Sequence, residues 1–241
     1  MVQVIFDLGN RAFDSTQSTY VITHGFLDNS GAQWVQQMIQ NLEFLDPNAN
    51  IIAVNWSSGT SVLDYATAVN STDDVGNTIA QFLVNMGANP NTTQLIGHSL
   101  GAHISGIAGD RYDFLTGRAI DTIVGLDPAG PDFEPLLFFS GKPESQRLDA
   151  SDARRVVAFH TSSTYGYDPA LADLDLYVNW DRWLQPGESD FSGNHSYAYK
   201  LYNQLLAGSS FSQSSFNATG TFFNLNDINN SSITGSVYVN T

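Results

Sequence analysis

Residues 97–101 read Gly-His-Ser-Leu-Gly, a G-x-S-x-G pattern that points to serine chemistry. In such a turn a strand passes directly into a helix, and the strained backbone presents the serine hydroxyl at the edge of a sheet. Glycines two positions before and after the serine remove side chains that would collide there. Residues 93–96 predict the strand and residues 102–108 the helix, so we expect Ser99 to be a nucleophile. The alternative is an ordinary Gly/Ser turn.

A serine hydroxyl needs a base to take its proton and a carboxylate to orient that base. For this kind of turn the expected chain order is serine, then acid, then histidine. Asp127 directly follows a predicted buried strand, so we expect it to be the orienting acid rather than part of an Asp-Pro turn. His103 is expected to pack against the sheet. His160 and His195 are the remaining candidates for the base, and spacing alone does not decide between them.

Acyl transfer also needs two N–H groups that stabilise the negative oxygen of the intermediate. One is the backbone amide after the nucleophile, which belongs to Leu100. The other comes from the loop after an early strand, and Phe26 occupies that place behind the strand at 19–23. We interpret the neighbouring His24 as a structural histidine that bonds nearby backbone.

Short apolar runs rich in β-branched residues alternate with helical periodicity, and these elements must position the candidate residues. Strands are expected at 19–23, 51–54, 93–96, 122–126 and 156–159. Helices are expected from apolar stripes at 34–42, 75–86 and 197–206, the second of them capped by Asp74 and Gly87. This alternation predicts a mostly parallel sheet covered by helices on both faces, with ligands at the carboxyl ends of the strands.

After Gly208 the composition shifts to Ser, Asn and Thr. We therefore divide the chain into a catalytic α/β domain at 1–207 and a C-terminal segment at 208–241. That segment is expected to form edge strands, at 221–225 and 236–239, or a linker.

The chain has 241 residues, with 24 acidic and 9 basic side chains and a net charge of −15. This balance argues against nucleic acid as a partner, because phosphates need a basic face. The absence of cysteine excludes disulfides, Cys-ligated zinc and thiol catalysis. No apolar run reaches the roughly 18 residues of a membrane span, and we see no N-terminal secretory signal. The compartment therefore stays open between the cytosol and export by another route.

Eight ordered segments resemble the pancreatic-lipase family, including its phospholipase A1 and galactolipase-like relatives. The resemblance covers roughly Thr19 to Ala207, and the segments lie at 23–26, 55–56, 97–103, 125–131, 147–153, 159–161, 185–187 and 195–199. The resemblance implies an α/β-hydrolase fold, with a mainly parallel central sheet flanked by helices. It also implies a carboxylic ester hydrolase that acts through an acyl-enzyme.

The family match implies a role for each candidate residue. It makes Ser99, Asp127 and His195 the catalytic triad. The amides of Phe26 and Leu100 would form the oxyanion hole. His160 falls in a His-Thr segment that is structural in the family, so we interpret it as non-catalytic.

The resemblance also implies a structural calcium ion and no organic cofactor. Glu144 and Arg147 would contribute backbone carbonyls, and Asp149 and Asp152 would contribute carboxylates. Hard oxygen ligands in a tight loop suit Ca²⁺. The alternative is a solvated acidic loop.

Two departures from the family bear on the substrate. The family usually carries disulfides, including one that brackets the lid, and this chain has none. Only Glu188–Asn194 separate the Gln-Pro-Gly segment at 185–187 from His195, and the loop Ser163–Asp173 is also short. Short surface loops accompany access for polar head groups in this family. We therefore expect galactolipids or phospholipids as substrates, with triacylglycerol as the alternative.

Access to lipid at a membrane or micelle surface needs an apolar rim. Trp180, Trp183 and Phe191 are the candidates, because indoles are favoured at membrane interfaces. The alternative is that one or both tryptophans belong to the core. A non-catalytic lipid-binding protein on the same fold is the hypothesis from another class, and all three triad positions being present argues against it. The sequence does not indicate an oligomeric state.

Overall fold

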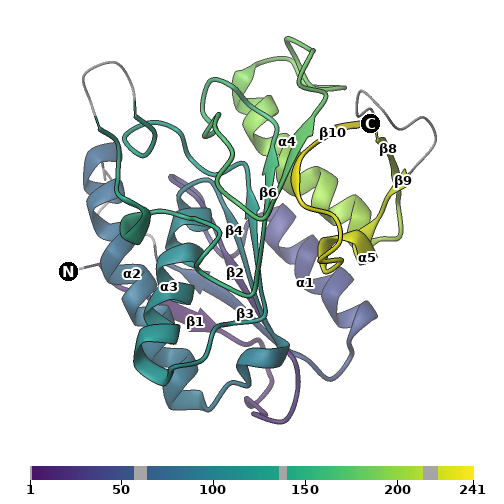
Figure 1. Cartoon of the computed structure of the whole chain (residues 1–241). Helices are drawn as coiled ribbons and strands as arrows, with labels where there is room; N and C mark the ends of the chain where they lie inside the picture. The colour runs from purple at the N-terminus through teal and green to yellow at the C-terminus, as the bar shows by residue number, and fades with distance from the viewer. Residues whose placement is uncertain (1, 57–63, 136–139, 214–221) are drawn as a thin grey trace.

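The computed structural model describes residues 2–56, 64–135, 140–213 and 222–241. In these ranges a single mixed sheet runs through the molecule (Figure 1), with strand order β1-β3-β2-β4-β5-β6-β7-β10-β8-β9. The strand bounds are β1 Ile5–Asp7, β2 Thr19–Thr23, β3 Asn50–Asn55, β4 Thr93–His98, β5 Thr122–Leu126, β6 Arg155–His160, β7 Leu174–Val178, β8 Phe211–Gln213, β9 Phe222–Phe223 and β10 Gly235–Asn240. The strands from β3 to β10 in this order are parallel, and β1, β8 and β9 pair antiparallel.

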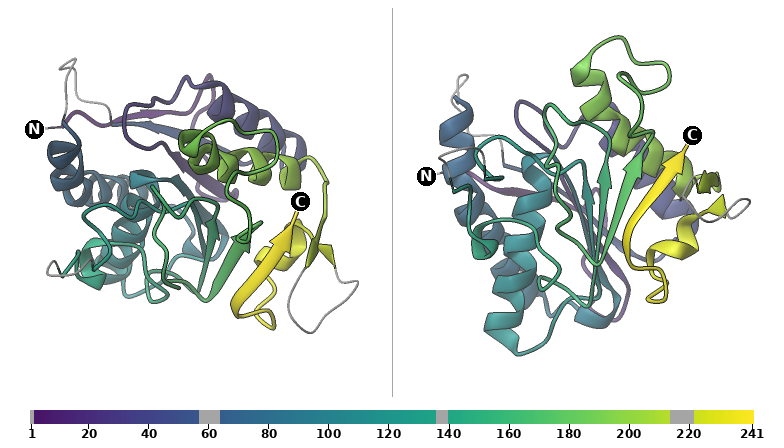
Figure 2. Two further views of the ribbon diagram at one scale, coloured as in Figure 1. Left: turned by 90° about the horizontal axis from the view of Figure 1, so that it is seen from above. Right: turned by 45° about the horizontal axis from the view of Figure 1, so that its top comes forward.

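Helices cover both faces of the sheet, as the views in Figures 1 and 2 show. One layer holds α2 (Tyr65–Met86) and α3 (Leu100–Thr116), and the other holds α1 (Gln33–Leu45) and α4 (Phe191–Leu206). Short helical turns lie at η1 (Pro90–Thr92), η2 (Glu144–Gln146) and α5 (Leu225–Ile228). The two apolar clusters on either side of the sheet form the core. The predicted α/β-hydrolase architecture, a mostly parallel sheet flanked by helices, is confirmed.

The strands predicted between residues 19 and 159 are confirmed with small changes at their ends. The strands at 19–23 and 122–126 have the expected bounds, and β3, β4 and β6 are each two residues longer than predicted. The strand predicted at 221–225 is partly wrong, because β9 holds only Phe222–Phe223, Leu225 begins α5, and residue 221 lies outside the described residues. Three strands, β1, β7 and β8, were not predicted. β7 carries a buried acid, Asp175, inside an otherwise apolar run, so its sequence lacks a continuous hydrophobic signal.

The start of α2 was predicted wrongly. Asp74 lies inside the helix, and the N-cap is Asp64, whose side chain accepts a hydrogen bond from the Thr67 N–H at 2.8 Å. The additional turns bury small residues such as Ala68 and Thr72, so the apolar stripe of large side chains starts well after the helix does. The C-cap is confirmed, because Gly87 ends the helix at φ +67°.

Strand register brings the candidate residues to one edge of the sheet. Gly97 of β4 pairs with Thr23 of β2 and with Gly125 of β5. The residues that follow these strands therefore leave the sheet side by side at its carboxyl end. Ser99 and Asp127 are two of them.

The C-terminal segment is built into this sheet. β10 lies between β7 and β8, pairing in parallel with β7, so this strand is internal rather than at an edge. The buried guanidinium of Arg155 in β6 donates to the carbonyls of Ile228 at 3.0 Å and Ile233 at 2.6 Å.

Among the helices in the described ranges, none combines the length and the hydropathy that a transmembrane span requires.

Replacing Arg155 with Ala should reduce the free energy of unfolding by about 2 kcal/mol, because hydrogen bonds from a charged donor to buried carbonyls are lost. Urea denaturation would measure the change. The exposed neighbour Arg154, replaced by Ala, is the matched control and should alter stability little. Equal stability of both variants would show that the C-terminal segment contributes little to the stability of the domain.

Candidate active site

Ser99 stands in a strained turn between β4 and α3. Its backbone has φ +58° and ψ −122°, a conformation that L-residues adopt at a cost. A Cβ on Gly97 would collide with the carbonyl of Gly101, and a Cβ on Gly101 would collide with the carbonyl of Thr23. The two glycines of the motif are therefore required by backbone packing, as the sequence predicts.

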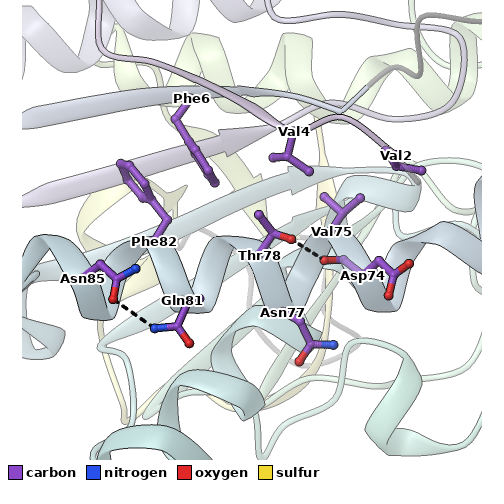
Figure 3. A pocket seen from close by; sticks show the side chains of 10 residues that line it. All are labelled: Val2, Val4, Phe6, Asp74, Val75, Asn77, Thr78, Gln81, Phe82 and Asn85. Carbon is purple, nitrogen blue, oxygen red and sulfur yellow. Dashed lines mark hydrogen bonds between the residues drawn. The ribbon is translucent and has the colours of Figure 1, made fainter.

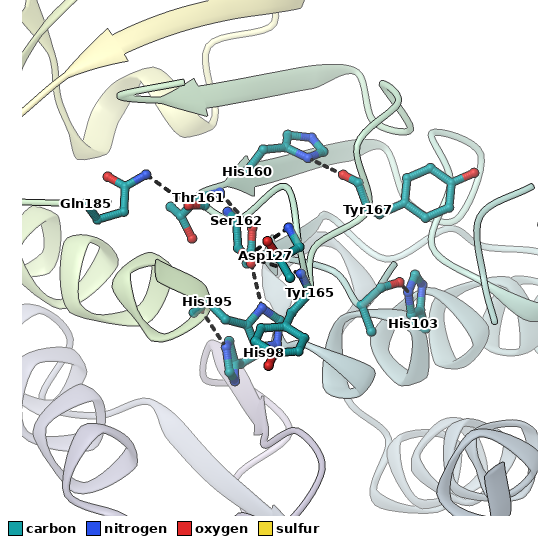
Figure 4. Close-up of polar contacts among 12 residues, drawn as sticks. His98, His103, Asp127, His160, Thr161, Ser162, Tyr165, Tyr167, Gln185 and His195 are labelled. Carbon is teal, nitrogen blue, oxygen red and sulfur yellow. Dashed lines mark hydrogen bonds and ion pairs between the residues drawn. The ribbon is translucent and has the colours of Figure 1, made fainter. Parts of the chain in front are cut away.

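Asp127 and His195 form a direct hydrogen bond (Figure 4). Asp127 directly follows β5 and is fully buried, and its Oδ2 lies 2.5 Å from Nδ1 of His195, which is near the start of α4. The other oxygen, Oδ1, accepts the N–H groups of Thr161 at 2.6 Å and Ser162 at 3.1 Å. These bonds fix the carboxylate and hold the imidazole with Nε2 away from the acid. Nε2 is the nitrogen that a serine base uses.

The structure thus brings together the three residues that the family match selected. Ser99 and His195 line the same pocket, and Asp127 lies behind His195. His160 lies elsewhere, in the interior at the end of β6. Its Nε2 is 2.8 Å from the carboxylate of Asp175 and its Nδ1 is 2.8 Å from the Tyr167 carbonyl, so it joins β6, β7 and the loop between them.

His98 is a residue whose contribution the sequence did not reveal. It is buried, and its Nε2 lies 3.1 Å from the backbone carbonyl of His195, to which it donates. Burial lowers the pKa of His98 well below 6.5, and neighbouring His195 adds to this, so the ring is neutral. The only feature of the sequence that could have indicated this role is the position of His98 directly before Ser99. The bond joins the nucleophile turn to the helix that carries the candidate base.

Phe26 and Leu100 lie where the expected oxyanion donors belong. Leu100 is the first residue of α3, so its N–H has no acceptor within the helix. The loop after β2 runs directly beside the nucleophile, because a Cβ on Gly25 would lie 2.7 Å from the Cβ of Ser99. Phe26 follows that glycine and lines the pocket. The helix N-terminus also favours negative charge at this point.

His24 and His103 have structural contacts. His24 stacks on Trp56, whose indole N–H donates to the His24 carbonyl at 2.9 Å. His103 donates to the Ala129 carbonyl at 2.8 Å and accepts the Leu148 N–H at 3.1 Å. Burial lowers the pKa of His103 to about 3, so it stays neutral and links α3 to the two loops beside it.

The pocket at Ser99 has a volume of about 610 Å³ and a mixed lining. Phe26 packs edge-on against the Tyr65 ring, whose hydroxyl donates to the Pro131 carbonyl, and these three contribute apolar surface, whereas α4 contributes Ser196 and Tyr199. Leu27 and Tyr165 also line it and are exposed, Leu27 by 83%. A larger groove of about 750 Å³ lies between the N-terminal segment and α2 (Figure 3), and none of the candidate catalytic residues lines it.

The three candidate interface residues lie in different surroundings. Trp183 is 79% exposed, and its ring contacts that of Phe191 edge to face, with centroids 5.3 Å apart. Trp180 is half-buried and packs edge-on against Tyr177 at 5.0 Å. Of the two tryptophans, Trp183 is the one that is largely exposed to solvent. Trp180 is packed against the protein, which is closer to the alternative that one tryptophan belongs to the core.

The segment that carries Trp183 is tied to the sheet by Gln185. The Gln185 side-chain amide is buried and donates to the carbonyls of Thr161 at 2.9 Å and Val178 at 2.8 Å. Its backbone N–H donates to the side chain of Asn194 in α4 at 2.8 Å. The chain between β7 and α4 is therefore held close to the site, and α4 starts at Phe191.

The candidate calcium residues lie together beside α3. Asp152 is buried, and one of its oxygens accepts the Asp149 N–H at 2.8 Å. Burial, followed by the charge of Asp149, raises the pKa of Asp152 to about 8. The Glu144 carboxylate is exposed and pairs with Arg147 at 3.6 Å, so Glu144 offers only its carbonyl. Within the described residues no group of three or more His, Cys, Asp or Glu side chains is placed to bind a metal. The expected calcium site has only two carboxylates and takes its other two ligands from backbone carbonyls, so it does not require such a group of three side chains.

Comparisons with known proteins show which proteins this chain is similar to. A family model described as "Lipase" matches residues 4–216. Over 182 residues the chain is 34% identical to mouse lipase member H, covering 73% of this chain and 38% of that protein. It is 36% identical to mouse pancreatic triacylglycerol lipase over 185 residues, covering 72% and 37%. It is also 36% identical to phospholipase A1 4 of Polistes dominula over 213 residues, covering 83% and 65%. The chain thus spans well under half the length of the two mouse relatives.

A serine-directed fluorophosphonate should label Ser99, and the modified peptide can be identified by mass spectrometry. Ser99→Ala should abolish labelling, and Asp127→Asn should slow it by about 10⁴-fold, because the imidazole loses its correct tautomer. Ser163→Ala changes an exposed serine outside the pocket and should label normally. Labelling of a different serine, or normal labelling of Asp127→Asn, would contradict the assignment.

Proposed function

The chain belongs to the pancreatic-lipase family, and we propose that it is a serine carboxylester hydrolase that releases fatty acids from polar glycerolipids through an acyl-enzyme. The observation that carries the proposal is the hydrogen bond between Asp127 and His195, because His195 lines the same pocket as the strained Ser99. The substrate class is a galactolipid or a phospholipid cleaved as by a phospholipase A1. Triacylglycerol is the alternative.

In the first half of the reaction, Nε2 of His195 takes the hydroxyl proton as the Ser99 oxygen attacks the acyl carbon. The carbonyl electron pair moves onto oxygen, and the N–H groups of Phe26 and Leu100 stabilise that charge. One such donor contributes about 3–4 kcal/mol of transition-state stabilisation in comparable sites. Asp127 stabilises the imidazolium that has formed.

In the second half, the intermediate collapses and the bond to the leaving alcohol breaks. His195 gives its proton to the alcohol oxygen, which leaves an acyl group on Ser99. His195 then removes a proton from water as the water attacks the acyl carbon. Collapse of the second intermediate releases the fatty acid and restores the serine hydroxyl.

The short surface segments support a polar head group. α4 starts at Phe191, so only three residues separate the Gln-Pro-Gly segment from the helix that bears His195. Residues 188–190 leave no room for a helical lid in this described stretch of the chain. A short segment here supports access for substrates with a bulky head group.

An exposed apolar rim supports action at a lipid surface. Trp183 and Phe191 contact each other at the N-terminal end of α4, and exposed Leu27 lies at the mouth of the pocket. Aromatic side chains in such positions insert into the boundary between head groups and acyl chains. The net charge of −15 favours neutral or zwitterionic surfaces over anionic ones.

We also propose a structural Ca²⁺ held by the carboxylates of Asp149 and Asp152 and the carbonyls of Glu144 and Arg147. The donors fit a hard cation, because two acids lie close together and Asp152 is buried. When bound, the ion would supply the positive charge that compensates these carboxylates. It would also link η2 to α3, because Asp152 lies against Gly106 of α3.

Release of fatty acid from a galactolipid and from phosphatidylcholine should exceed release from triacylglycerol, and Ser99→Ala should abolish all of it, by about 10⁶-fold. Titration of released acid on mixed micelles would measure the rates. A preference for triacylglycerol would be compatible with ester hydrolysis by Ser99 but would contradict the proposed polar-lipid substrate class. No release by the folded protein would favour a non-catalytic lipid-binding role.

Trp183→Ala should reduce hydrolysis of phosphatidylcholine vesicles by about tenfold, because an indole no longer inserts into the lipid surface. Hydrolysis of p-nitrophenyl butyrate, a dissolved ester, should be unaffected. Phe44→Ala is the matched control, since Phe44 is 85% exposed near the far end of α1. An equal loss on both substrates would mean that Trp183 shapes the pocket and not the lipid contact.

Calcium at about 100 times its Kd should stabilise the protein by about 2.7 kcal/mol, or about 5 to 10 °C in Tm. The increase over chelator should be larger at pH 8 than at pH 5. In the calcium-free fold the Asp152 carboxyl has a pKa of about 8, so it stays protonated below that pH. The stability that this raised pKa provides is lost as the pH rises toward 8. Calcium binds the ionised carboxylate, so protonation at pH 5 opposes calcium binding. Asp149→Asn should remove the calcium effect, and Asp113→Asn, an exposed acid on α3, should keep it. An unchanged Tm with calcium at both pH values would reject the site.

A further inference from the structure

A second hollow adjoins the Ser99 pocket between α1 and α4. Its volume is about 530 Å³, and Asp28 and Tyr199 line both hollows, so the two are neighbours. We call it the α1–α4 groove. Besides these two residues, the side chains that matter for its chemistry are Gln33, Gln37, Lys200 and Asn203.

The groove lies on the side of the site where the leaving alcohol must be. His195 gives its proton to the leaving oxygen in the proposed mechanism, so the alcohol faces His195. Tyr199 and Asn203 follow His195 at four-residue steps along α4 and share its face of the helix. A glycerolipid keeps its head group on that alcohol, whichever of its ester bonds is broken. The head group is thereby directed along α4 toward the groove, while Phe26 and Tyr65 offer the acyl chain an apolar side.

The groove offers hydrogen-bonding groups that the protein itself does not use. Within the part of the chain that the structure describes, the Gln33 amide and the Tyr199 hydroxyl have no hydrogen-bond partner. Asp28 accepts the Trp34 indole N–H at 2.7 Å and retains further acceptor positions. Gln37 donates to Asn41 at 3.2 Å and retains its amide oxygen. Closely spaced amide, phenol and carboxylate groups suit a ligand with several hydroxyl groups, because each hydroxyl can both donate and accept.

The charges in the groove do not suit a phosphate. Lys200 is the one cation that lines it, and its Nζ lies 2.6 Å from the Glu188 carboxylate. With Asp28 also present, the described charges around the groove are two acids and one base. A phosphate needs unpaired Arg or Lys side chains, so this balance favours an uncharged head group.

Resting on the proposed function, we propose that the α1–α4 groove binds the uncharged, hydroxyl-rich head group of a glycosyl diacylglycerol. Gln33 and Tyr199 would hydrogen-bond the sugar hydroxyls, and Asp28 would accept from one of them. Loss of one or two such bonds should change selectivity by about tenfold.

The test compares kcat/KM on monogalactosyl diacylglycerol and on phosphatidylcholine in the same mixed micelles. Gln33→Ala should lower the ratio of the two values by about tenfold, and Tyr199→Phe should lower it in the same direction. Gln40→Ala is the matched control, since Gln40 is exposed on the same helix outside the groove. Thermal unfolding of each variant would verify that it is folded.

Two outcomes would overturn the proposal. One is an unchanged ratio in both Gln33→Ala and Tyr199→Phe. The other is a selective loss of phosphatidylcholine hydrolysis in Lys200→Gln, which would assign the groove to a phosphate head group. Hydrolysis of p-nitrophenyl butyrate by the unaltered protein separates these outcomes from failure of the proposed function, because that substrate has no head group.

Discussion

The close approach of three backbone segments at Ser99 is the constraint on which the site depends. The end of β2, the end of β4 and the first turn of α3 meet there, and Gly25, Gly97 and Gly101 each lie where a Cβ would strike a neighbour. This contact holds Ser99 at positive φ, and the cost of that conformation is of order 1–3 kcal/mol. The surrounding sheet and helix must offset it. The parallel register of β2, β4 and β5 does so by fixing where each strand ends.

A second residue of the site, the acid Asp127, is also held in a strained backbone conformation. Asp127 also has positive φ, +46°, immediately after β5. That turn directs its carboxylate toward α4 on one side and toward the N–H groups of Thr161 and Ser162 on the other. The neighbouring bond from His98 to the His195 carbonyl then ties α4 to the end of β4. The acid and base candidates are thus joined by their side chains, and the turn that carries Ser99 is joined to the helix of the base through His98.

Much of the fold and of the candidate site was predictable from the sequence, because these features depend on residues that are close together in the chain. Buried β-branched runs predict β2 and β5 to the residue, and the G-x-S-x-G pattern specifies its own turn around Ser99. The choice between His160 and His195 was not local, because both follow Asp127 and only the fold shows which one faces it. The resemblance to a known family made that choice, and the 2.5 Å contact agrees with it.

Other features depend on partners distant in sequence. Nothing near Gly235–Asn240 reveals that this strand pairs with β7 inside the sheet, since its exposed first residues resemble an edge strand. The buried Asp175 hides β7 in the same way, because its partner His160 lies fifteen residues earlier. The start of α2 escaped prediction because small residues form its buried face there.

The placement of the site on adjacent parallel strands also has a dynamic consequence. Ser99 and Asp127 follow β4 and β5, which lie in the interior of the sheet between two layers of helices, and the His98 bond adds α4 to the same unit. Separating Ser99 from Asp127 therefore requires central strands to part, and central strands are the last part of a domain to release their amide protons to solvent exchange. We expect the candidate residues to stay assembled through local fluctuations that open the surrounding loops, so a ligand could enter and leave rapidly while the geometry of the site is kept.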